Sequence, residues 1–117
     1  MISHVVLFRT KADLSGDERT ALIASFERAM REIPTVRSVR VGKRIAVGAG
    51  YEQRAVDGVE FLVAIDFDDV IDLQTYLEHP AHAELAERFN RTCVTTMILD
   101  VVVTQDASGV SRWLPSE

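Results

Sequence analysis

The sequence predicts an α+β protein of the ferredoxin-like type, with the order βαββαβ and an antiparallel sheet that carries its helices on one face. Two observations carry this prediction: four segments have the apolar pattern of strands, and helical patterns follow the first and the third of them. The chain has 117 residues, which suits one compact domain. We therefore expect one domain over residues 1–104 and a polar C-terminal tail over residues 105–117.

The first strand and the first helix both show a clear apolar period. Residues 2–9 are rich in β-branched and aromatic residues, and alternation places four side chains on one face: Ile2, His4, Val6 and Phe8. Ser15 and Glu18 have the spacing of a capping box, so a helix begins there. An apolar stripe follows at helical spacing: Leu22, Phe26, Ala29 and Ile33. Pro34 then ends the helix.

Apolar patterns predict three further strands, and a glycine-rich loop separates the first two of them. Residues 36–45 alternate between valine and polar residues, whereas residues 47–58 hold three glycines among polar residues and predict a loop. Residues 59–67 place an apolar row on one face of the third strand: Val59, Phe61, Val63, Ile65 and Phe67. Residues 95–104 are nearly continuous in apolar character and predict a long final strand.

Two short helices are predicted between the third and fourth strands. Asp69 can cap the first of them. Pro80 begins the second, because proline is tolerated in a first turn, and His79 then becomes its N-cap. An apolar face with i, i+3, i+4, i+7 spacing follows: His82, Leu85, Ala86 and Phe89. This spacing predicts that His82 points inward rather than into solvent.

Composition and charge exclude several classes of partner. The net charge is −5 and the basic residues are scattered, which argues against nucleic acid and against an anionic membrane surface. Cys93 is the single cysteine and is expected to be a packed residue, so no intrachain disulfide and no cysteine-based metal cluster is expected. A helix cap and a solvated surface explain an acidic cluster better than a metal site does: Asp66, Asp68, Asp69 and Asp72. We expect a cytoplasmic protein without a membrane span, metal or organic cofactor.

The strands also predict self-association. Several of them carry apolar residues on both faces, although the helices can cover only one face of the sheet. A second copy of the same sheet is the simplest cover for the other face, so we expect a homodimer. Trp113, in the tail, is expected to dock on the domain or on the partner subunit.

Three sequence features together carry a family resemblance. They are the early strand Ile2-Ser3-His4-Val5-Val6-Leu7-Phe8, the motif Tyr76-Leu77-Glu78-His79-Pro80-Ala81-His82, and an acid, Asp100, in the closing strand. Over residues 1–104 the chain resembles the stress-responsive dimeric α/β-barrel family. The resemblance implies a dimer in which two sheets form a barrel. Some members are known as proteins induced under stress, and others close linear polyketides by intramolecular aldol condensation without metal or organic cofactor.

The resemblance also implies particular site residues. The working pair of such cyclases corresponds to Tyr76 and His82, and His4 corresponds to a histidine near their pocket. Phe61 occupies a pocket position where one such cyclase, a plant member of the family, has another imidazole, so the same substrate is not expected. In such a reaction His82 acts as base and Tyr76 as hydrogen-bond donor to the developing enolate. The expected ligand is small, hydrophobic and carbonyl-bearing.

Other interpretations of the same residues remain open. The motif can serve only to hold two helices together, with His82 hydrogen-bonded to Tyr76 or to a backbone carbonyl. The chain is then a non-catalytic stress-response protein whose dimeric assembly is its function. A third hypothesis, from the fold alone, is cofactor-free oxygenation of the kind carried out by related barrels.

Overall fold

The computed structural model describes residues 1–54 and 58–116. Its strands are β1 (Ile2–Thr10), β2 (Ser38–Lys43), β3 (Phe61–Phe67) and β4 (Cys93–Val102). Its helices are α1 (Gly16–Glu32), the 3-10 helix η1 (Gly50–Arg54), α2 (Val70–Glu78), α3 (Pro80–Thr92) and α4 (Ser108–Trp113). Residues 55–57 of the predicted loop and residue 117 of the predicted tail lie outside the described residues.

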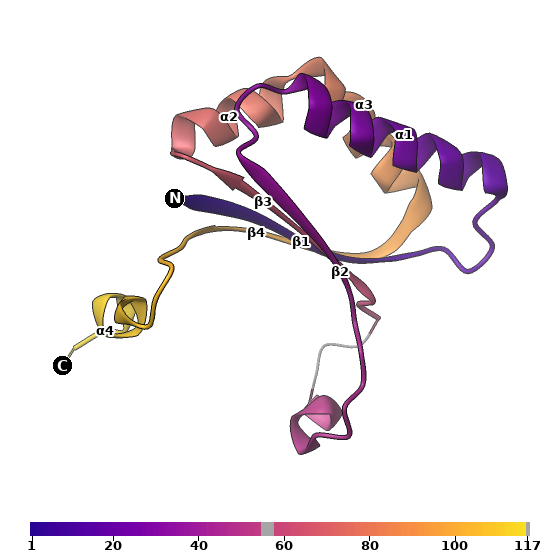
Figure 1. Ribbon diagram of the computed structural model, residues 1–117. Coiled ribbons are helices and arrows are strands. Elements are labelled where there is room, and N and C mark those ends of the chain that lie inside the picture. Colours follow the sequence, from indigo (N-terminus) through magenta and orange to yellow (C-terminus); the bar gives the residue numbers. More distant parts are fainter. Residues whose placement is uncertain (55–57, 117) are drawn as a thin grey trace.

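The four strands form one antiparallel sheet in the order β2-β3-β1-β4. Helices α1, α2 and α3 lie together on one side of this sheet, and α4 lies beyond the other side (Figure 1). The register sets His4 between Ile65 on β3 and Asp100 on β4. The prediction of a ferredoxin-like α+β fold is confirmed.

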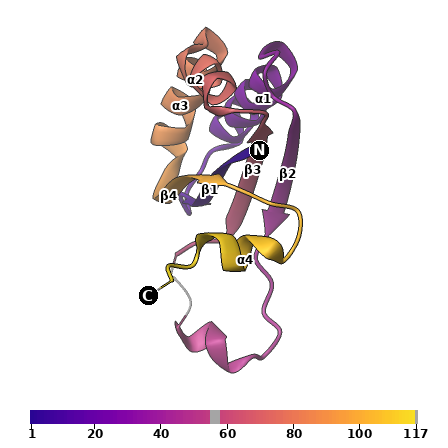
Figure 2. The same cartoon turned by 90° about the vertical axis from the view of Figure 1, so that its left-hand side faces the viewer.

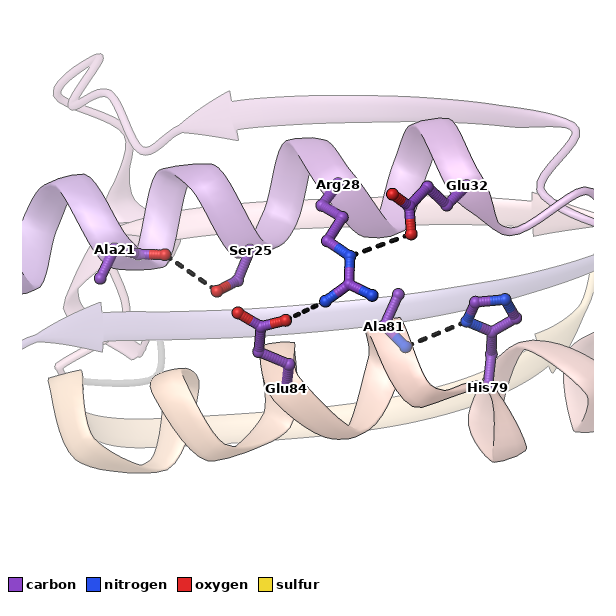
Figure 3. Close-up of polar contacts among 7 residues, drawn as sticks. All are labelled: Ala21, Ser25, Arg28, Glu32, His79, Ala81 and Glu84. Atoms are coloured by element: carbon purple, nitrogen blue, oxygen red, sulfur yellow. Dashed lines mark hydrogen bonds and ion pairs between the residues drawn. The ribbon is translucent and has the colours of Figure 1, made fainter.

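The core lies between the sheet and its helices. The apolar positions predicted for β1, α1 and β3 supply most of it, and its most deeply buried members include Ala29, Ile33, Ile65, Phe67 and Tyr76. Helices α1 and α3 pack side by side, and Arg28 of α1 pairs with Glu32 on its own helix and with Glu84 on α3 (Figure 3). These ion pairs are half exposed, so apolar burial holds the two layers together.

Side-chain caps fix where the helices begin. The Ser15 hydroxyl accepts a hydrogen bond from the Glu18 amide at 3.1 Å, and the Asp69 carboxylate accepts one from the Asp72 amide at 2.8 Å. His79 ends α2 and caps α3, because its Nδ1 accepts a hydrogen bond from the Ala81 amide at 3.0 Å (Figure 3). The capping roles predicted for these three residues are confirmed.

The structure differs from the sequence prediction at strand ends and in the tail. β4 begins at Cys93, two residues early, because Cys93 pairs with Thr10 at the end of β1. β3 begins at Phe61 rather than at residue 59. The predicted tail contains the six-residue helix α4, which lies below the helix layer and the sheet in Figure 2. Six residues are too few to show a helical period in the sequence.

Candidate functional site

A cavity of about 430 Å³ lies between the helix layer and the sheet. The strands contribute mainly apolar walls: Val6, Phe8, Val41, Val63, Ile65 and Ile98. The helices close the opposite side: Leu22, Ile23, Phe26, Leu77, Leu85, Ala86 and Phe89. Five polar or ionisable side chains also line the cavity: His4, Tyr76, His82, Asn90 and Asp100. A mainly apolar cavity with a few convergent polar groups is typical of a small-molecule site.

Tyr76 lies at the centre of the polar group. It projects from α2, is 1% exposed, and its ring centroid lies 4.8 Å from that of His82 and 5.8 Å from that of His4. Phe67 packs on it at 5.1 Å. Burial raises the pKa of Tyr76 to about 12, so the phenol keeps its proton at neutral pH. Tyr76 is therefore a neutral hydrogen-bond donor held in a fixed position.

His82 lies in the first turn of α3 and lines the cavity together with Leu85, Ala86 and Phe89 of the predicted stripe. Burial lowers its pKa, the nearby His4 lowers it further, and a hydrogen bond to the backbone carbonyl of Leu77 acts in the opposite direction. Burial is thus the main cause of the lowered pKa. A neutral imidazole that donates through one nitrogen presents the other as a proton acceptor.

His4 and Asp100 form a pair across the β1–β4 ladder. They are register partners, and His4 Nδ1 lies 2.5 Å from Asp100 Oδ1. The His4 ring is nearly buried, whereas the Asp100 side chain is 43% exposed. An ionised carboxylate only accepts hydrogen bonds, so this contact places a proton on His4 Nδ1 and fixes the orientation of the ring. Asp100 thereby fixes the position of the His4 ring among the polar side chains of the cavity.

Two of the cavity residues, Asn90 and Asp100, were missed as site residues by sequence reasoning. The signal for Asp100 is an acidic residue inside an otherwise apolar strand. Phe61 does not line this cavity, in contrast to the expectation from the sequence. Its ring packs 5.5 Å from that of Phe8, and its place on β3 is four residues, about 13 Å, from Ile65, the register partner of His4.

The other singled-out residues lie outside the cavity. His79 serves as a cap, and Cys93 is half-buried at the start of β4, where burial raises the pKa of its thiol. Asp69 caps α2, while Asp68 pairs with Arg37 at 2.8 Å. Within residues 1–54 and 58–116, no group of three or more histidine, cysteine, aspartate or glutamate side chains is placed to hold a metal ion. No helix in the described part of the chain is long and apolar enough to cross a membrane.

Two proteins with named activities are similar to this chain. Olivetolic acid cyclase from Cannabis sativa is 19% identical over 99 residues, which cover 85% of this chain and 93% of the cyclase. Hydroxynitrile lyase from Passiflora edulis superposes with a TM-score of 0.74 at 20% identity, covering 90% of this chain and 94% of the lyase.

A third relative is a dimeric ferredoxin-like protein of unknown function from Thermobifida fusca. It superposes with a TM-score of 0.66 at 20% identity, covering 87% of this chain and 90% of that protein. At these identities the structural likeness establishes the fold alone. The sequence of residues 2–103, most of the chain, matches the family described as the stress responsive A/B barrel domain. The chain belongs to this stress responsive A/B barrel domain family.

Proposed function

We propose that this protein is a cofactor-independent enzyme of the aldol-cyclase or lyase type that acts on a small, hydrophobic, carbonyl-bearing molecule. The observation that carries the proposal is the convergence of Tyr76, His82 and the His4–Asp100 pair on one mainly apolar cavity. The likeness to a cyclase and a lyase supports the same reaction class. A role in stress responses, which the family description indicates, is compatible with such an activity.

The chemistry follows from the protonation states of the two rings. His82 removes a proton from the carbon next to a carbonyl, and the electron pair of that C–H bond forms an enolate. Tyr76 donates its hydrogen bond to the enolate oxygen without carrying charge. The enolate carbon then attacks a second carbonyl carbon of the same molecule, and the oxygen of that carbonyl takes up a proton from His82. The step consumes no oxidant or reductant.

A linear diketone that can close to a six-membered ring carrying a ketone and a β-hydroxyl group tests this proposal. We expect His82→Gln to lower the rate of ring closure by about 100- to 10,000-fold, the usual contribution of a general base. His79→Asn is the matched control, because it changes the other histidine of the motif and keeps a capping side chain. A folded His82→Gln protein with the wild-type rate would refute the proposed role.

The pH profile adds a second readout. The base must be neutral, and burial lowers the pKa of His82 below the ordinary histidine value of 6.5. Activity should therefore persist as the pH falls past 6.5 and decline only below it. A decline centred at or above 6.5 would indicate a different base.

We further propose that the protein forms a homodimer through the sheet face that the helices leave uncovered. Side chains alternate between the two faces of a strand, so the β1 residues next to His4 and Val6 point to the uncovered face. Together with residues of β3 and β4 on the same face they form an apolar row: Val5, Leu7, Leu62, Met97, Leu99 and Val101. Leu99 is 50% exposed in the single chain. The Thermobifida fusca relative is dimeric, which supports the same assembly here. This uncovered face is called the open face below.

A further inference from the structure

Helix α4 buries too little of its surface against the described residues to explain why it is folded. Asp106 accepts hydrogen bonds from the Ser108 amide and hydroxyl at its first turn, but the N-cap residue Ala107 supplies no side-chain cap. A helix of six residues is not stable by itself in water, so its stability must come from packing. Within α4, however, only Gly109 is buried.

The apolar side of α4 is exposed. Val110 is 62% exposed, Trp113 49% and Leu114 65%, and their i, i+3, i+4 spacing places them on one side of the helix. Trp113 packs against Gly109, where an added Cβ would lie 3.1 Å from the indole and 2.5 Å from the Thr104 hydroxyl. This close approach holds the indole against the helix and leaves about half of its surface free for another contact.

The position of α4 indicates which surface it meets. α4 lies on the side of the sheet opposite to α1, α2 and α3, that is, on the side of the open face (Figures 1 and 2). A partner seated on the open face therefore lies on the same side of the sheet as α4.

We propose that α4 packs against a second copy of this chain, at the edge of the contact between the two open faces. The family match ends at residue 103, so α4 lies outside the matched domain. The inference rests on the proposed homodimer. The occupant is a second copy because α4, with its exposed apolar side chains, and the apolar row of the open face lie on the same side of the sheet.

Trp113 is the only tryptophan of the chain, so its fluorescence reports on α4 directly. In the full-length dimer we expect a blue-shifted emission, which moves to the red when Leu99→Asp separates the open faces. Val110→Glu should raise the dimer dissociation constant in sedimentation equilibrium by about tenfold or more. Ser111→Glu is the matched control, since it places the same charge in the same helix but off the apolar side.

Each outcome is decisive. A wild-type protein that is monomeric at every concentration would refute the dimer and this inference together. A dimer whose dissociation constant is the same with Val110→Glu as with Ser111→Glu would refute the inference and leave the dimer intact. An emission that stays blue-shifted in monomeric Leu99→Asp would show that α4 packs on its own domain. An emission that is red-shifted already in the wild-type dimer would show that Trp113 is exposed to solvent in the dimer and would refute the inference.

Discussion

The two faces of the one sheet differ in an instructive way. The face under the helices holds the polar side chains of His4 and Asp100 among apolar walls, whereas the open face carries exposed apolar side chains such as Leu99. In an ordinary two-layer sheet the covered face is apolar and the other face is polar. The polar side chains on the covered face support the proposed chemistry, and the exposed apolar side chains on the open face support the proposed assembly.

The largest expected change in stability comes from a substitution on the covered face. Phe67 is fully buried beside Tyr76, so Phe67→Ala should lower the free energy of unfolding by about 3–5 kcal/mol. Ile71→Ala is the matched control, because Ile71 is 71% exposed on α2 and should change stability by less than about 0.5 kcal/mol. Urea unfolding of both variants checks this, and similar losses for the two would contradict the assignment of the core.

A substitution on the open face should change the assembly of the protein rather than its folding. Leu99→Asp places a carboxylate in the apolar row, where it would have to lose its hydration when a second copy docks. We expect a folded monomer, measured by sedimentation and by circular dichroism. Ile71→Asp, at an exposed position away from the sheet, should leave the dimer unchanged. A Leu99→Asp protein that remains dimeric would show that the interface lies on another surface.

A smaller effect separates the two histidines of the motif. His79→Ala removes the cap of α3 and should cost about 1 kcal/mol in a urea titration. His79→Asn should recover most of this loss, since an asparagine side chain also caps. If His79→Ala instead abolished ring closure without a change in stability, His79 would belong to the site rather than to the framework.

Local patterns predicted the fold because each depends on neighbouring residues. The His79-Pro80 pair predicts the start of a helix, and the apolar stripe from His82 to Phe89 predicts which side of that helix faces inward. Such local patterns could not predict contacts between side chains that lie far apart in the sequence. His4 and Asp100 are 96 positions apart, and they meet only because the β1–β4 register aligns them. The register also sets Phe61 beside Phe8, at the far end from the polar group.

The central claim is that the cavity under the helices is the ligand site, and the three histidines of the chain can test it together. Their ring signals can be followed by NMR, assigned through single substitutions, while a medium-chain linear ketone is added at several pH values. We predict that His82 and His4 shift on addition, that His79 does not, and that His82 titrates below pH 6.5. Signals from His82 and His4 that remain unchanged, or a shift of His79 as large as theirs, would contradict the account.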